Sequence, residues 1–263
     1  MIKRILFFAA LVFSTVASSQ IISTKKPDSI SNWKKTNKVG LDFTQITFVN
    51  WSAGGNNSIS GLAKGQFIRN YALDNKKWDN ELIIRYGMNK QESQDVRKTD
   101  DQINLNSTLG YRRDTISNWY YGGKFSFLTQ FANGYSYPNT DQAISKPFAP
   151  AYTFLGVGSE YILKEEKLTI YLSPLTFKNT LVLDQTLANQ GAFGVTKAVY
   201  DAEGNLVSEG KKTKTELGIL VSATYEREVY KNISVHNKLS LYTDYINNFG
   251  NIDVDWQFKV DLV

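Results

Sequence analysis

The sequence of 263 residues contains no cysteine and a single histidine, His236. Without cysteine there can be no disulfide bond, no thiolate metal site and no lipidated N-terminal cysteine. With one histidine, sites that need two imidazole ligands are excluded, and these include most zinc enzymes. The formal net charge of +5 is small, so binding to nucleic acid is not predicted.

The chain also lacks the long hydrophobic runs of helical membrane proteins. Mean hydropathy is −0.32 and 21% of the residues are charged, whereas a bundle of membrane helices needs runs of about 20 apolar residues. One apolar stretch, residues 5–16, follows Lys3 and Arg4 and precedes three small residues. This order is typical of a cleaved signal peptide, with a retained anchor as the alternative. We therefore expect export and removal of residues 1–19, followed by an extended lead-in segment at residues 20–37.

From residue 38 onward, apolar and polar side chains alternate. Near the end of the chain, for example, Val254, Trp256 and Phe258 alternate with Asp255 and Gln257. This period of two predicts strands with one apolar and one polar face, and no segment has a convincing helical period. The pattern predicts ten strands, at residues 38–52, 56–74, 77–91, 97–113, 117–131, 152–163, 167–184, 213–230, 233–247 and 251–263.

The connections between these strands alternate in length. Short turns follow every second strand, and the longest connections, residues 132–151 and 185–212, fall between them. Long strands joined in this way are typical of outer-membrane β-barrels, and Trp78, Trp119 and Tyr225 near strand ends suit the interfacial aromatic girdles. We predict an all-β, antiparallel transmembrane β-barrel over residues 38–263. A secreted β-sandwich and a lipocalin-like binding barrel with apolar residues inside are the alternatives.

The polar parity of the predicted strands carries many charged side chains. In a membrane barrel this parity faces the lumen. We therefore predict an internal charge network that comprises Glu81, Arg85, Arg112, Lys124, Glu216, Glu226 and Lys259.

Catalytic and metal sites are the competing interpretations of the same polar residues. A Ser-His-Asp site would have to use His236, but no nucleophile-elbow pattern accompanies it. We therefore expect a structural lumen histidine and no enzymatic activity. Asp253, Asp255 and Asp261 lie along one strand without the turn that a calcium loop needs. No metal and no other cofactor is predicted.

Four motifs occur in a characteristic order. They are Trp-Ser-Ala-Gly-Gly-Asn-Asn-Ser at residues 51–58, Thr-Gln-Phe-Ala-Asn-Gly-Tyr at 129–135, Pro-Phe-Ala-Pro-Ala-Tyr at 147–152 and Leu-Ser-Pro-Leu-Thr-Phe-Lys at 172–178. In these motifs the chain resembles the Bacteroidetes family called domain of unknown function 3078. The resemblance spans roughly residues 38–263 and implies an outer-membrane barrel, without an assigned activity.

Two of these motifs also permit a local structural prediction. Gly54, Gly55 and Asn56 allow positive φ and predict a tight loop after Trp51, with a ligand-binding loop as the alternative. Pro174 cannot donate to a β-ladder, and the apolar parity changes around it. We therefore expect a β-bulge or bend at this position.

The last predicted strand alternates up to the end of the sequence. Either residues 251–263 pair with residues 38–52 and close a ten-stranded barrel, or the natural chain continues and supplies two more strands. The family resemblance favours the second outcome, a barrel of twelve strands.

Three functions are compatible with these features. The first is a structural or interaction protein that contacts outer-membrane lipid and takes part in a larger outer-membrane protein assembly. The second is a narrow pore for small solutes, and the third is a hydrolase around His236. The sequence favours the first.

Overall fold

The computed structural model describes residues 31–49, 55–246 and 249–262. From residue 32 onward these residues form one compact unit. The predicted signal peptide and most of the predicted lead-in segment lie outside the described residues. No helix in the described part of the chain is long and apolar enough to cross a membrane.

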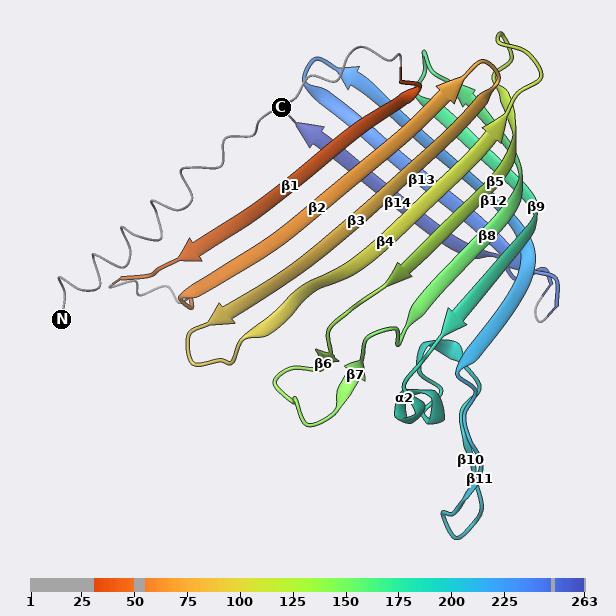
Figure 1. The fold of residues 1–263 in the computed structure, drawn as a ribbon. Helices are drawn as coiled ribbons and strands as arrows, with labels where there is room; N and C mark the ends of the chain where they lie inside the picture. The colour runs from red at the N-terminus through yellow and green to blue at the C-terminus, as the bar shows by residue number, and fades with distance from the viewer. Residues whose placement is uncertain (1–30, 50–54, 247–248, 263) are drawn as a thin grey trace. The chain divides into compact units, whose positions relative to one another are not determined.

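The unit is built on one antiparallel sheet of ten strands in the order β1-β2-β3-β4-β5-β8-β9-β12-β13-β14 (Figure 1). Neighbours in the sheet are consecutive long strands of the chain, so the sheet is an up-and-down meander. The ten strands are β1 (Trp33–Ile46), β2 (Ser58–Leu73), β3 (Lys76–Gln91), β4 (Arg97–Tyr111), β5 (Trp119–Thr129), β8 (Ala151–Leu163), β9 (Leu168–Leu181), β12 (Thr213–Tyr230), β13 (Ile233–Asp244) and β14 (Asp253–Leu262). The predicted all-β fold with ten strands is confirmed.

The first strand begins earlier than the sequence predicted. β1 starts at Trp33, inside the segment assigned to the lead-in, and pairs with β2 from Trp33 opposite Tyr71 to Ile46 opposite Ser58. The indole of Trp33 packs on Tyr71 and Trp78 with ring centroids 5.2 and 5.6 Å apart. Lysines at positions 34, 35 and 38 obscure the alternation in the sequence, so this part of the strand looked like a polar linker.

The turns and loops separate to the two ends of the sheet, as the sequence predicted. Residues 74–75, 112–118, 164–167 and 231–232 lie at one end, which we call the short-turn end. Asp74 and Asn232 take φ values of 47° and 65° there, which short polar side chains tolerate well. Residues 47–57, 92–96, 130–150, 182–212 and 245–252 connect strands at the opposite end, the long-loop end.

The two longest connections contain short strands and helices of their own (Figure 1). The first connection contains the strand pair β6 (Gly134–Tyr135) and β7 (Ala143–Ser145). The second contains the helix α2 (Gln185–Asn189), the 3₁₀ turn η1 (Ala192–Gly194) and the hairpin β10 (Val199–Tyr200) and β11 (Leu206–Ser208). These helices were not predicted, because one turn of helix is too short to leave a period of 3.6 in the sequence.

The predicted bulge at Pro174 is confirmed. β9 shifts register against β8 between Val157 and Ser159, and against β12 between Gly218 and Leu220. The Ser173 hydroxyl lies within hydrogen-bond distance of two carbonyl oxygens in this irregularity, those of Val157 at 3.0 Å and Leu175 at 2.9 Å. The bulge moves the following side chains of β9 to the opposite parity, which keeps its apolar residues on one face of the sheet.

The two edges of the sheet are β1 and β14. In the described residues β1 pairs only with β2, and β14 pairs only with β13. The ten-stranded closure by pairing residues 251–263 with residues 38–52 is therefore absent from this structure.

Candidate functional site

A cavity of about 700 Å³ lies against one face of the sheet. Its lining extends from Asn106 and Thr108 on β4 to Ser240 on β13 and Asp255 on β14. Because β4 and β14 stand far apart in the strand order, the sheet must curve around this cavity. We call the face that lines the cavity the inner face and the opposite one the outer face.

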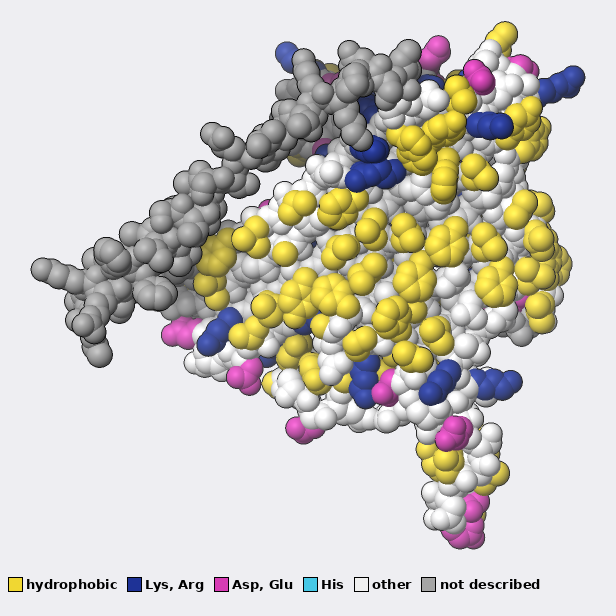
Figure 2. Space-filling model, viewed as in Figure 1, with side chains coloured by type: hydrophobic (Ala, Val, Ile, Leu, Met, Phe, Trp, Pro, Cys, Tyr) yellow, Lys and Arg dark blue, Asp and Glu magenta, His cyan; other side chains and the backbone are white. Residues whose placement is uncertain are grey.

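The outer face is apolar and exposed. Large hydrophobic side chains project from it along successive strands, and Leu41, Leu109 and Trp256 have exposed fractions of 76%, 58% and 66%. Figure 2 shows hydrophobic side chains spread over the middle of this face, with Lys, Arg, Asp and Glu mainly toward the strand ends. In a water-soluble sheet the apolar face would be covered by another layer. Here it has no covering layer in the described residues.

Aromatic side chains gather on the outer face at the short-turn end. Trp78, Trp119, Tyr111 and Tyr121 are all exposed there, and Trp119 packs against Tyr161 with ring centroids 5.0 Å apart. Such amphipathic rings are typical of the boundary between lipid and water. The structure thus places Trp78 and Trp119 where an interfacial girdle would require them. Tyr225, on β12, also lies on the outer face.

The inner face, in contrast, buries charged groups. Glu160 on β8 is only 7% exposed and forms ion pairs with Lys77 on β3 and with Lys124 on β5, the latter at 2.6 Å. The Lys77 ammonium lies 4.6 Å from the centre of the Tyr120 ring, and that of Lys124 lies 4.2 Å from the Tyr171 ring. The Glu160 carboxylate therefore joins β3, β5 and β8, and the contact of Lys124 with Tyr171 adds β9 to this inner cluster.

Glycine makes room for the inner cluster. A Cβ atom on Gly110 would lie 2.8 Å from Cε of Lys77. A Cβ atom on Gly122 would lie 1.9 Å from the carbonyl oxygen of Leu109, a distance that no side chain can adopt without a backbone shift. The strands β4 and β5 can therefore approach closely beneath Tyr120.

A second charged group lies further around the inner face. Glu216 on β12 accepts from Lys214 at 3.2 Å and from Lys178 of β9 at 3.5 Å. Lys178 also pairs with Asp253 on the edge strand β14 at 3.6 Å, and its ammonium lies 4.8 Å from the ring centre of Tyr242. Lys178 consequently links β9, β12, β13 and β14 on the face that lines the cavity.

The predicted lumen residues fall into separate groups. Lys124 and Glu216 belong to the two groups just described. Glu81 accepts from Gln66 at 2.5 Å, and Arg85 pairs with Asp100 at 2.5 Å. Arg112 follows the end of β4 and lies 5.3 Å from the Tyr120 ring centre. The structure thus does not bring all seven residues into one network.

Sequence analysis missed the residues at the centre of these groups. Lys77, Glu160 and Lys178 lie on the polar parity of their strands, but nothing in the alternation distinguishes them from other polar positions. The alternation indicates only which face a residue is on. Which acid meets which base depends on strand register, and the bulge in β9 changes that register.

Glu226 and Lys259 are found around the single histidine. The Nδ1 atom of His236 lies 3.4 Å from Glu226, and its Nε2 atom lies 2.9 Å from Asp261, the neighbour of Lys259 on the same face. Lys259 pairs with Asp261 at 2.7 Å. In the part of the chain that the structure describes, no group of three or more histidine or acidic residues is arranged to hold a metal ion.

The predicted glycine loop is only partly described. Trp51 and Gly54 lie outside the described residues. Gly55 has φ of 132°, and a Cβ atom there would lie 2.8 Å from the ring of Phe48, so this position requires glycine. Asn56 is exposed and lies just before the start of β2 at Ser58.

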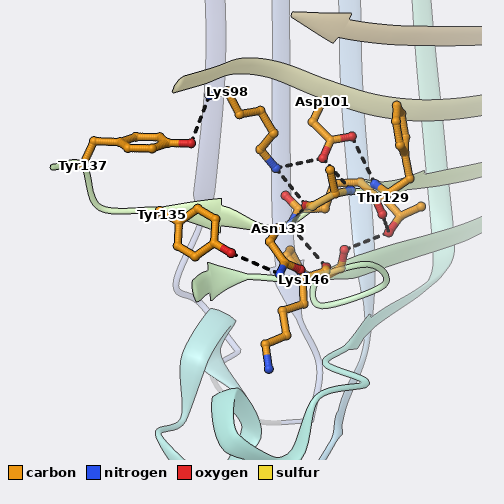
Figure 3. Close-up of polar contacts among 11 residues, drawn as sticks. Lys98, Asp101, Thr129, Asn133, Tyr135, Tyr137 and Lys146 are labelled. Atoms are coloured by element: carbon orange, nitrogen blue, oxygen red, sulfur yellow. Dashed lines mark hydrogen bonds and ion pairs between the residues drawn. The ribbon is translucent and has the colours of Figure 1, made fainter. Parts of the chain in front are cut away.

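The motif at residues 129–135 ties the first long loop to β4 (Figure 3). The Asp101 side chain is 2% exposed and accepts from Lys98 at 2.8 Å. It also accepts from the backbone N–H groups of Phe131 and Ala132, at 3.0 and 2.9 Å. The Tyr137 hydroxyl accepts from the backbone of Lys98. This motif therefore has a structural role, because it fixes where the loop leaves the sheet.

The two longest loops pack on each other around a small hydrophobic core. Ala149 of the first loop is fully buried with Val182, Leu187 and Ala188 of the second. Lys146 and Asp184 form an ion pair of 2.6 Å across the same contact. This hydrogen bond from Lys146 lowers the pKa of Asp184 below its usual value, although partial burial opposes the effect. Asp184 also caps α2 by accepting from the backbone of Leu187.

Asp184→Ala is expected to loosen this contact, because it removes the ion pair and a helix cap that contributes about 1 kcal/mol. Hydrogen exchange at the α2 amides should quicken about fivefold or more at pH 7. Because the folded pKa is lowered, the contribution of Asp184 is present above pH 4 and is lost as pH falls through that folded value. The difference in α2 exchange between wild type and variant should therefore shrink at pH 3.

The control is Asp201→Ala, in the exposed turn of the hairpin, which should leave α2 exchange unchanged. Equal exchange in wild type and Asp184→Ala at pH 7 would contradict this account.

Comparisons with known proteins give one family and one distant structure. No curated protein matches the chain. One solved structure, the translocator domain of autotransporter NalP from Neisseria meningitidis, matches with 12% identity and a TM-score of 0.34, over 87% of this chain and 73% of the other. The family described as "Protein of unknown function (DUF3078)" matches residues 43–135, which run from the end of β1 to β6. This is the family that the sequence resembles, and the matched segment includes two of the four motifs, at residues 51–58 and 129–135.

Proposed function

We propose that this protein is an outer-membrane β-barrel protein of structural or interaction type. The main observation behind this proposal is that the sheet has the opposite polarity to a water-soluble one. It exposes a hydrophobic outer face and buries Glu160 and Glu216 on the inner face. Such a sheet is stable where lipid covers the apolar side and water or protein contacts the polar one. A lipocalin-like barrel does not fit, because its inner face would be apolar.

The orientation follows from the two ends. Outer-membrane barrels have short turns on the periplasmic side and longer loops outside. The short-turn end of this sheet would then face the periplasm. Its aromatic girdle would lie at the periplasmic boundary of the outer membrane. The long-loop end, including α2 and the β10–β11 hairpin, would face the cell exterior.

The interaction role is supported by the hairpin. It projects away from the sheet (Figure 1) and every residue from 199 to 208 is exposed. Val207 is 65% exposed, and Tyr200 53%. The segment at its base is held by hydrogen bonds such as those from Gln185 and Lys211 to backbone carbonyls. A projecting hairpin on an anchored base suits contact with another protein of an outer-membrane assembly. The proposed role does not include catalysis, because both ring nitrogens of His236 lie against carboxylates and neither faces a nucleophile of the described residues.

A narrow pore is the second candidate. The lining of the cavity of about 700 Å³ on the inner face includes Lys124, Lys178 and Asp255 as well as apolar side chains such as Leu128 and Phe154, and its charged groups would suit the passage of small polar solutes. Conductance of the purified protein in a planar bilayer distinguishes this candidate, because a protein of purely structural type gives no channel steps.

The membrane assignment is tested by extraction and by gel mobility. The protein should stay with the outer-membrane fraction until detergent is added, and unboiled samples should migrate differently from boiled ones because the barrel resists the detergent of the gel. Solubility of the exported protein without detergent would contradict the proposal.

The orientation is tested with single cysteines, which a cysteine-free chain makes unambiguous. On intact cells, a membrane-impermeant maleimide should label Ala202→Cys in the hairpin and should not label Ser117→Cys at the short-turn end. Labelling of Ser117→Cys on intact cells with no labelling of Ala202→Cys would reverse the orientation.

The interaction role is tested by replacing residues 199–208 with a short glycine linker. Chemical cross-linking in native outer membrane should give a stoichiometric partner for the wild type and lose it for this variant. A variant with glycine at residues 93–95, in another loop of the same end, is the matched control and should keep the partner. Retention of every cross-link by the hairpin variant would exclude the hairpin as the contact.

A further inference from the structure

Three hairpins of the sheet share one arrangement of side chains on the inner face. Each hairpin consists of two strands that are joined at the short-turn end, and the three are β4–β5, β8–β9 and β12–β13. The second strand of each carries a buried tyrosine: Tyr120 is 9% exposed, Tyr171 2% and Tyr242 7%. A lysine from the preceding hairpin lies over each ring. The ammonium-to-ring-centre distances are 4.6 Å for Lys77 over Tyr120, 4.2 Å for Lys124 over Tyr171 and 4.8 Å for Lys178 over Tyr242.

Each lysine reaches its tyrosine across an intervening strand. In the strand orders β3-β4-β5, β5-β8-β9 and β9-β12-β13, the lysine and the tyrosine start two strands apart, which is about 10 Å in a sheet. The strand between them carries a glycine at the crossing. A Cβ atom would lie 2.8 Å from Cε of Lys77 on Gly110, 2.8 Å from the hydroxyl oxygen of Tyr171 on Gly156 and 3.0 Å from Cε2 of Tyr242 on Gly218. A larger residue at the crossing would therefore push the lysine or the ring aside.

These contacts cross the boundaries between successive hairpins. The two strands of one hairpin are joined by a short turn, whereas successive hairpins are joined only by the connections at the long-loop end. We call the ladder between two successive hairpins a seam, and the three seams concerned are β3–β4, β5–β8 and β9–β12. Each contact between a lysine and a tyrosine spans one seam, because the lysine lies on one side of it and the ring belongs to the hairpin on the other.

A glycine at the crossing also distinguishes the native register from a slipped one. A slip of one residue turns the apolar side chains to the wrong face, but a slip of two residues preserves both faces. Alternation of apolar and polar residues therefore cannot exclude the second kind of slip. On β4 a slip of two residues would put Thr108 or Arg112 in the place of Gly110. Either side chain would hold the lysine and the ring apart, so the contact forms only in the native register of this seam.

We propose that these three Lys–Gly–Tyr units are locks, each of which fastens one hairpin to the preceding one. A cation over the face of an aromatic ring is attracted to it, most strongly where water is excluded, and the burial of the three tyrosines supplies this condition. Each seam has its own lock, so the loss of one ring loosens one seam and leaves the other two closed. The locks belong to the sheet itself and act in the same way whether the protein is an interaction protein or a pore.

The test is backbone hydrogen exchange of the full-length protein, in detergent or, if the protein needs none, in buffer. Tyr171→Leu removes the ring but keeps the ion pair between Lys124 and Glu160. Amides that donate across the β5–β8 seam should exchange about tenfold faster than in the wild type. Amides across the other two seams should exchange at the wild-type rate. Tyr120→Leu should act in the same way on the β3–β4 seam only, and Tyr242→Leu on the β9–β12 seam only.

Two comparisons separate a lock from a ring that only fills space. Tyr171→Phe keeps the ring over Lys124 and should leave the β5–β8 seam as it is in the wild type. A ring that serves only its own hairpin would, when lost, speed exchange across the β8–β9 ladder as much as across the seam. A wild-type circular dichroism spectrum verifies that each variant is folded, and the three leucine variants report on separate seams. Unchanged seam exchange, equal acceleration within the hairpin, or acceleration of all three seams by one substitution would overturn the proposal.

Discussion

Leu105→Arg is expected to destabilise the protein in a lipid bilayer by about 2–4 kcal/mol. Leu105 lies in the middle of β4 on the outer face, where its partner on β5 is Phe127. A guanidinium at this depth must either leave water or distort the lipid around it. Reversible urea unfolding in phospholipid vesicles measures the free energy of unfolding directly.

Asn104→Arg is the matched control, one residue away on the same strand. Asn104 points to the inner face, where its side chain accepts from Asn106 at 3.1 Å. An arginine there remains among polar groups, so the loss should be below about 1 kcal/mol. The pair shares a strand, depth and substitution, and differs only in the face. Equal losses at the two positions would show that the faces are assigned wrongly.

Glu160→Gln should cost about 3 kcal/mol of unfolding free energy, because it leaves Lys77 and Lys124 without the carboxylate that both contact. These lysines are 14% and 27% exposed in their side chains, so water screens them only in part. The same unfolding experiment in vesicles at pH 7 measures the loss.

The control is Asp42→Asn, which breaks the ion pair between Asp42 and Lys64 near the edge of the sheet. That pair has a short distance of 2.5 Å, but both side chains are about half exposed, so its removal should cost less than about 1 kcal/mol. A double variant, Glu160→Gln with Lys77→Met, should recover part of the loss because it removes one unpaired charge. If Glu160→Gln proves no more harmful than Asp42→Asn, the inner cluster contributes no more than an exposed ion pair.

Strand content and face assignment were accessible from the sequence because the side-chain period of a strand is two. Nine of the ten strand segments agree with the structure to within a few residues, and the first begins earlier, at Trp33. Pro174 was a reliable marker of the bulge, since a residue without an N–H group cannot continue the ladder. An up-and-down meander places successive connections at opposite ends of the sheet, so the two longest loops, which follow β5 and β9, lie at the same end.

The sequence by itself therefore determined an all-β meander with one apolar and one polar face. Tertiary structure alone decided which charges meet, because Glu160, Lys77 and Lys124 come together only through the registers of β3, β5 and β8. It also decided that Asp101 fastens the loop at residues 129–135 and that Ala149 packs against Leu187 of a distant loop. A period of two specifies the face of each side chain, whereas its neighbours on that face depend on register and curvature, which arise only when the strands pair.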